Sequence, residues 1–148
     1  MKTYKSKLSH LSLKVNDSPF NKVKLTSSKD AVSVIRQFFS DDIEIYESFF
    51  ILLLNRANNT IGYAKISQGG CAGTVVDIKI IAKYCIDSLS QSVILCHNHP
   101  SGSLTPSNED KNITVNIKNT LLIFDCKVID HIILTKDSFF SFTDDGLL

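Results

Sequence analysis

The order of the expected secondary-structure elements predicts a mixed α/β domain. The expected order along the 148-residue chain is helix, two strands, helix, strand, helix and two strands. Two patterns support this order: apolar residues recur at helical spacing in some segments, and short apolar runs bounded by turn residues lie between them. No internal repeat or low-complexity linker divides the chain. We therefore expect one domain with a largely sequential sheet flanked by helices.

We expect residues 1–26 to form an extended N-terminal arm and residues 27–148 to form the domain. The arm alternates only weakly, and its lysines at positions 2, 5 and 7 are expected in a solvated tail. Ser27 and Asp30 then form the pattern of a helix N-cap. The apolar positions of this first helix keep helical spacing and end before Asp41: Val32, Ile35, Phe38 and Phe39.

A long apolar run, Phe49–Leu54, predicts a strand that is buried on both faces. Asn55–Asn59 forms the expected turn, and Thr60–Ser67 returns as a second strand. The glycines at positions 69, 70 and 73 indicate a flexible connection. Their spacing matches neither a P-loop nor a dinucleotide-binding fingerprint, so a phosphate-binding loop is not expected here.

The second half of the chain is expected to hold two helices and three strands. Asp77 is placed to cap a helix, and its apolar face is made of Ile78, Ile81, Ala82, Cys85 and Leu89. The run Val93–Cys96 predicts a buried strand. Ser107 begins a helix to about Leu122, with Ile113, Ile117 and Leu121 on one side. Lys127–Leu134 and Ser138–Phe142 are expected to form a closing hairpin.

The residues with the clearest chemistry follow the strand Val93–Cys96. His97 and His99 are two positions apart, so they point to the same side of a strand end. After a turn-rich loop, Ser107 and Asp110 have the spacing of a helix cap. The two imidazoles and the carboxylate suit a tetrahedral zinc site with one open position. The alternative is purely structural, with solvated histidines and a capping pair, although capping and metal binding are compatible.

The stretch from His97 to Asp110 has the form H-N-H-P-S-G-x-x-x-P-S-x-x-D. This string resembles the JAMM signature of JAB/MPN metallopeptidases, and its fuller form resembles the bacterial RadC branch. The likeness covers about Glu47 to Gly146 and includes the stretch Val128–Ile133. It implies a three-layer α/β fold of the JAB/MPN, cytidine-deaminase-like type, with a mixed sheet flanked by about three helices.

The resemblance also implies a zinc-dependent metallopeptidase or isopeptidase that uses a zinc-activated water. His97, His99 and Asp110 would hold Zn²⁺, and Ser107 would donate a hydrogen bond to the oxyanion. Hydrolysis further needs a general base. The pattern alone leaves Glu44 and Glu47 open, whereas the layout of RadC-like proteins favours Glu47, directly before the strand. The expected partner is a protein or peptide substrate.

His131 lies in an Asp-His-Ile stretch with apolar neighbours. We expect it to support the metal ligands, paired with Asp130 or a backbone carbonyl, and not to bind the metal directly. Cys96 should point away from His97, because neighbours in a strand face opposite sides. The four cysteines form no C-x-x-C pair, and we expect no disulfides. His10 lies alone in the arm.

The balance of 16 basic and 15 acidic residues gives no overall attraction to nucleic acid or membrane. No apolar run approaches the about 20 residues of a membrane helix, so a cytoplasmic protein is expected. The resemblance to RadC-like proteins also leaves open a DNA-associated module related to DNA repair, and a metal-binding scaffold without catalysis is a third alternative. The lack of a basic stripe gives the nucleic-acid partner only weak support.

Overall fold

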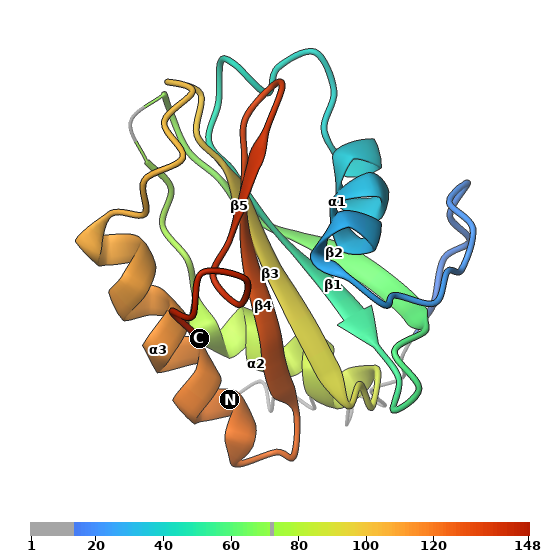
Figure 1. Ribbon diagram of the computed structural model, residues 1–148. Coiled ribbons are helices and arrows are strands. Elements are labelled where there is room, and N and C mark those ends of the chain that lie inside the picture. Colours follow the sequence, from blue (N-terminus) through green and yellow to red (C-terminus); the bar gives the residue numbers. More distant parts are fainter. Residues whose placement is uncertain (1–13, 72) are drawn as a thin grey trace, which may run out of the picture.

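A five-stranded mixed sheet lies between one helix on one face and two helices on the other (Figure 1). The computed structural model describes residues 14–71 and 73–148. The helices are α1 (Ser28–Ile35), α2 (Ile78–Asp87) and α3 (Asn108–Leu122), with a 3₁₀ turn, η1 (Arg36–Phe38), after α1. The strands are β1 (Ser48–Leu54), β2 (Thr60–Gln68), β3 (Ser92–Asn98), β4 (Lys127–Leu134) and β5 (Phe139–Ser141). The predicted α/β class and order of elements are confirmed.

The strand order is β2-β1-β3-β4-β5, and only β3 and β4 pair in parallel. Every residue of β1 and β3 is buried, as expected for central strands covered on both faces. Alternate residues of these strands therefore enter two separate cores. One core lies under α2 and α3 and includes Leu95, and the other lies under α1 and includes Ile94. The first core also contains Phe49, which pairs with His97 near the carboxyl end of β3.

A bulge in β4 decides which of its polar residues faces α3. Val93 pairs with Val128, but Ile94 pairs with Asp130, so Ile129 is an extra residue in β4. The shift changes the face of every later residue in this strand. His131 consequently pairs with Leu95 and lies on the same side of the sheet as that residue.

Three predicted boundaries were wrong. Leu89 does not lie on the apolar face of α2: the helix ends at Asp87, and Leu89 has a φ of 52° and is 80% exposed. Its amide donates to the carbonyl of Ile86, and the amide of Ser90 donates to that of Cys85, which is the pattern of a Schellman motif. Because leucine and not glycine occupies the left-handed position, the sequence does not reveal this helix end.

The first helix is also shorter than its apolar spacing suggested. Its α-helical part stops at Ile35, and Phe38 belongs to the following 3₁₀ turn. The last strand, β5, covers Phe139–Ser141 instead of Ser138–Phe142. Residues 14–26 of the arm contain no regular strand, and Lys24 makes an isolated bridge to Asn59. His10 and the three arm lysines lie outside the described residues.

None of the helices in residues 14–71 and 73–148 is long and apolar enough to span a membrane.

Candidate metal centre

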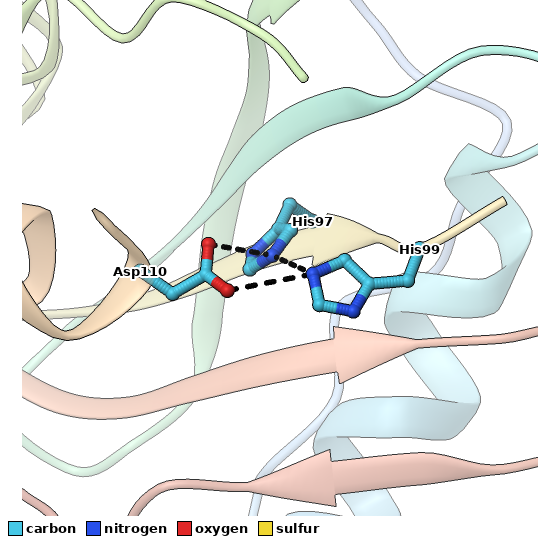
Figure 2. A group of neighbouring side chains, drawn as sticks. All are labelled: His97, His99 and Asp110. Atoms are coloured by element: carbon cyan, nitrogen blue, oxygen red, sulfur yellow. Dashed lines mark hydrogen bonds and ion pairs between the residues drawn. The ribbon is translucent and has the colours of Figure 1, made fainter. Parts of the chain in front are cut away.

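The carboxyl end of β3 carries the first two residues of the candidate site. His97 is the sixth residue of β3, and His99 follows the strand directly. Both side chains point toward the start of α3, where Asp110 lies (Figure 2). The His97 side chain is buried, and that of His99 is partly exposed. The strand therefore presents two imidazoles on one side of its carboxyl end, as the two-residue spacing predicted.

The capping box of α3 holds the third residue in place. The Ser107 hydroxyl accepts a hydrogen bond from the Asp110 amide at 3.0 Å, and the Asp110 carboxylate accepts one from the Ser107 amide at 2.7 Å. This is the reciprocal pattern that the Ser-x-x-Asp spacing predicted. The same carboxylate also faces the histidines, so the helix cap orients the side chain that completes the group.

The distances within the group match those around a single tetrahedral metal ion. The Nε2 atoms of His97 and His99 are 2.9 Å apart. The Asp110 carboxylate oxygens lie 3.2 Å from Nε2 of His97 and 3.4 Å from Nε2 of His99. Zinc bonds of about 2.0–2.1 Å in tetrahedral geometry place neighbouring ligand atoms about 3.3 Å apart. These three residues can therefore hold one metal ion without large rearrangement.

The hydrogen bonds of the group show why a cation fits it. The Nδ1 atom of His99 lies 2.7 Å from the Ser103 carbonyl, which can only accept, so the hydrogen of a neutral His99 ring is on Nδ1. Its Nε2 lone pair then points at His97 and at an acceptor-only carboxylate. Such convergent acceptors need a proton or a metal ion between them. A metal-binding histidine commonly donates its other nitrogen to a backbone carbonyl in this way.

The pKa values of Asp110 and His99 also show that this group attracts a cation. Burial acts to raise the pKa of Asp110, but the contacts of its carboxylate with the His97 and His99 rings outweigh it and hold that pKa well below its usual range. The hydrogen bond to Asp110 raises the pKa of His99 above its ordinary value. The carboxylate thus stays ionised and attracts whichever cation, H⁺ or metal, occupies the group.

Glu47 enters the same cleft from the neighbouring strand. Phe49 pairs with His97 in antiparallel β1 and β3, and their rings stack with centroids 6.0 Å apart. Glu47 lies two residues before Phe49, immediately before β1. Together with His97, His99 and Asp110, it lines an open cleft of about 640 Å³. Burial raises the pKa of Glu47, while nearby charges on His97 and His99 oppose this rise.

Glu44, the other glutamate considered, lies outside the cleft lining. It is exposed, and its carboxylate forms an ion pair with Lys136 at 2.9 Å. The structure thus brings Glu47, and not Glu44, to the three candidate ligands. Ser107 also lines the cleft.

A glycine-rich segment lies beside Glu47, and its residues Cys71 and Gly73 line the cleft. The Glu47 amide donates to the Gly70 carbonyl at 3.0 Å, and the Gly69 amide donates to the Glu47 carbonyl at 2.8 Å. A Cβ atom on Gly69 would lie 1.9 Å from the Gly73 carbonyl oxygen, so only glycine fits this crossing. Gly69 and Gly70, which the sequence indicated as part of a flexible connection, therefore pair with the backbone of Glu47.

Asn98, between the two histidines, holds the segment that leads to Glu47. Its side chain accepts a hydrogen bond from the Ser48 amide at 2.8 Å and donates to the carbonyls of Ile43 and Tyr46 at 2.7 and 2.8 Å. The sequence alone indicated no role for Asn98. Strand alternation could have indicated this role, because it turns Asn98 to the face of β3 opposite the histidines, where its amide needs hydrogen-bond partners within the fold.

His131 contacts a candidate ligand, but with different side-chain partners from those expected. Its Nε2 lies 2.8 Å from Nδ1 of His97, and its Nδ1 lies 2.6 Å from the Thr114 hydroxyl. Asp130 accepts a hydrogen bond from the backbone amide of His131 and not from its ring, and its carboxylate also accepts from the Ser141 hydroxyl. The expected pairing with Asp130 or a carbonyl was therefore wrong for the ring. Thr114 was missed, although it lies one helical turn after Asp110 on the same face.

All four cysteines are free, and Cys96 belongs to the core under α1, on the face opposite His97. Cys71 is exposed and lines the cleft, a position that the sequence did not indicate.

Comparison with known proteins agrees with this arrangement. A family model described as "RadC-like JAB domain" matches residues 25–147. The chain belongs to this family. A UPF0758 protein of Flavobacterium johnsoniae is 43% identical over 124 residues, which cover 84% of this chain and 53% of that protein. UPF0758 proteins of Porphyromonas gingivalis and Clostridium beijerinckii are 34% and 38% identical, over 84% and 86% of this chain and 54% and 55% of their own lengths.

This RadC-like JAB domain therefore spans about half the length of these relatives. The His97-His99-Asp110 group lies within the matched region, as do Glu47 and Ser107.

Proposed function

We propose that this domain is a zinc-dependent hydrolase of peptide or isopeptide bonds. The observation that carries the proposal is the convergence of the two Nε2 atoms and the Asp110 carboxylate, with the Glu47 carboxylate in the same cleft. Two imidazoles and one carboxylate form a three-ligand set that leaves a fourth position for water or substrate, as in catalytic zinc sites. A structural zinc site would instead have four protein ligands.

The roles of the cleft residues follow from their chemistry. A zinc ion held by His97, His99 and Asp110 would supply a Lewis acid that makes water nucleophilic near neutral pH. Glu47 would take a proton from the attacking water and give it to the departing amine. Its raised pKa suits this exchange, because a base that must also return the proton works best when its pKa approaches the working pH.

Ser107 would stabilise the charge that develops on the substrate oxygen. Its hydroxyl oxygen accepts a hydrogen bond from the Asp110 amide, and this leaves the hydroxyl hydrogen available to a substrate. A donor of this kind, fixed before the reaction, lowers the barrier to acyl transfer without the cost of reorganisation. The helix cap thus serves the ligand and the oxyanion donor at once.

The composition of the cleft supports a peptide-like substrate over a nucleic acid. Among the described residues that line it, none is lysine or arginine, while Glu47, Glu109 and Asp110 are acidic. Binding of a phosphate backbone relies on basic side chains. Apolar contacts are available from Phe49, Val76 and Ile113. A neutral or cationic extended chain fits this lining better than a polyanion does.

Substitution of Glu47 tests the proposal. Glu47→Gln keeps the size of the side chain but removes its ability to accept a proton. We expect the zinc content to stay near that of the wild type while hydrolysis falls by about 10²–10⁴. The assay is a mass-spectrometric screen of zinc-loaded protein against linear peptides and peptides joined through a lysine side chain.

Glu44→Gln is the matched control, because Glu44 pairs with Lys136 at the surface. This variant should retain both zinc and activity. Loss of zinc in Glu47→Gln would make Glu47 a fourth ligand and the site structural. Equal activity of Glu47→Gln and wild type would remove Glu47 as the base.

A further inference from the structure

A continuous chain of hydrogen bonds runs from the backbone of α3 to the metal-facing ring of His97. The Thr114 hydroxyl donates to the Asp110 carbonyl at 2.5 Å and lies 2.6 Å from Nδ1 of His131. The opposite nitrogen of His131, Nε2, lies 2.8 Å from Nδ1 of His97. His97 and His131 are 1% and 0% exposed, so bulk water does not replace these partners.

The hydrogens of this chain can be assigned from the one end whose role is fixed. A carbonyl oxygen can only accept, so the single hydrogen of the Thr114 hydroxyl is used in the bond to Asp110. The hydroxyl oxygen can then only accept from His131, which places the hydrogen of a neutral His131 ring on Nδ1. Two oxygens 2.5 Å apart without a hydrogen between them would repel, which disfavours the opposite assignment.

The same reasoning continues to His97. With its hydrogen on Nδ1, His131 presents a lone pair at Nε2. The contact at 2.8 Å then requires the hydrogen of His97 to be on Nδ1. The remaining nitrogen of His97, Nε2, carries a lone pair that faces His99 and Asp110.

We propose that Thr114 is a positioning residue that acts through His131 to fix which nitrogen of His97 carries its hydrogen, and so leaves Nε2 free to bind the metal. An imidazole can donate or accept at either nitrogen, so His131 alone would leave the choice open. Thr114 removes the ambiguity because its own hydrogen is committed to Asp110. The proposal rests on the metal site of the proposed function, but not on hydrolysis.

This arrangement also links two of the three ligands. Thr114 bonds to the backbone of Asp110, whose side chain faces His97 directly. The bulge in β4 is a condition for the link, because it turns His131 toward His97. The first turn of α3, β4 and the end of β3 thus determine the donor atoms of the site together.

The first test reads the hydrogens directly. Long-range ¹H–¹⁵N NMR of the histidine rings in metal-free protein, at mildly alkaline pH, distinguishes the two neutral forms of each ring. We expect the wild type to carry hydrogen on Nδ1 of both His131 and His97. Hydrogen on Nε2 of His131 in the wild type would overturn the proposal.

The second test compares two substitutions of one residue. Thr114→Val keeps the shape but removes the hydroxyl, so His131 loses the acceptor for its Nδ1 hydrogen and can turn Nε2 into a donor. That change moves the His97 hydrogen onto Nε2, where it opposes the metal. We expect zinc affinity, measured by competition with a chromophoric chelator, to fall about 10–100-fold. Thr114→Ser retains the hydroxyl and should stay close to the wild type in affinity and in its NMR signature.

Ile117→Val is the packing control. Ile117 is fully buried on the same helix, and its substitution perturbs the core without touching the hydrogen-bond chain. We expect its zinc affinity to match that of the wild type. Zinc binding by Thr114→Val as tight as that of wild type would overturn the proposal. If Thr114→Val fails to fold, the wild-type NMR result and Thr114→Ser still decide it.

The tests separate this inference from the proposed hydrolase function. A protein that binds zinc, responds to Thr114→Val as expected and hydrolyses nothing would contradict the function and support the inference. Normal affinity in Thr114→Val, with Glu47-dependent hydrolysis, would contradict the inference and support the function.

Discussion

His97 and Asn98 are neighbours on β3, and both are buried, but their polar atoms have different kinds of partners. Asn98, on one face of the sheet, makes its three hydrogen bonds with backbone groups of a single segment. The ring nitrogens of His97, on the other face, lie near polar atoms of three side chains: His99, Asp110 and His131. On the Asn98 face, the polar groups are therefore paired within the fold. On the His97 face, several hydrogen-bond acceptors point toward a common position.

The difference separates a structural from a functional use of a buried polar residue. Buried polar groups are stable when each has a complementary partner, as at Asn98. On the His97 face, the imidazole lone pairs and the Asp110 carboxylate oppose one another unless a cation joins them. The H-N-H sequence thus places Asn98, which supports the segment before Glu47, between two candidate metal ligands, and strand alternation directs their side chains to opposite faces.

The largest expected effect comes from removing a ligand on the His97 face. Purified wild-type protein should hold close to one zinc per chain, and His97→Ala or His99→Ala should reduce this to near none, because three ligands leave little redundancy. Metal analysis of the purified proteins measures the change. Full zinc occupancy in a variant that carries both His97→Ala and His99→Ala would place the metal elsewhere. It would contradict the role assigned to the His97 face.

The opposite result is expected on the Asn98 face. Asn98→Ala leaves one backbone amide and two carbonyls without their partner, and should lower the free energy of unfolding by about 3 kcal/mol. Chemical denaturation measures this loss, while zinc content per folded chain should stay near that of the wild type.

Asn55→Ala offers a matched control for Asn98→Ala. The Asn55 side chain accepts hydrogen bonds from Ala57 and Asn59 in a turn that solvent reaches, so its loss should cost only about 1 kcal/mol. An Asn98→Ala variant that kept its stability but lost zinc would reverse the roles assigned to the two faces.

The dependence of zinc affinity on pH sharpens the description of the His97 face. Asp110 raises the pKa of His99, so a proton occupies that ring to a higher pH than in a free histidine. Zinc must displace this proton. Affinity should therefore be constant above the pKa of His99 and fall about tenfold for each pH unit below it. Chelator competition between about pH 5 and about pH 8 measures the profile. A flat profile would contradict it.

The sequence predicted the features that depend on local spacing. Three patterns were enough to predict that His97, His99 and Asp110 lie together. They are the apolar run before His97, the His-x-His alternation and the Ser-x-x-Asp cap. The pattern alone did not choose between Glu44 and Glu47, and the likeness to RadC-like proteins favoured Glu47, which lines the cleft. These patterns express backbone geometry, which short segments specify by themselves.

The features that the sequence did not predict depend on contacts between distant segments. The bulge that turns His131 toward His97 is visible only in the pairing of β4 with β3. The Schellman turn at Leu89 uses a residue that seldom adopts positive φ, so packing overrides the local preference. Thr114 resembles any polar residue on a helix until His131 approaches it. The sequence therefore indicated the candidate metal ligands but not the residues that position them.

X-ray absorption at the zinc edge of the metal-loaded protein tests the central claim most directly. The account predicts a first shell of about four nitrogen and oxygen atoms near 2.0–2.1 Å, with the outer-shell scattering of two imidazoles. One of these light atoms would come from solvent or substrate. A sulfur atom near 2.3 Å would bring a cysteine, such as Cys71 at the cleft, into the site and contradict the three-ligand assignment.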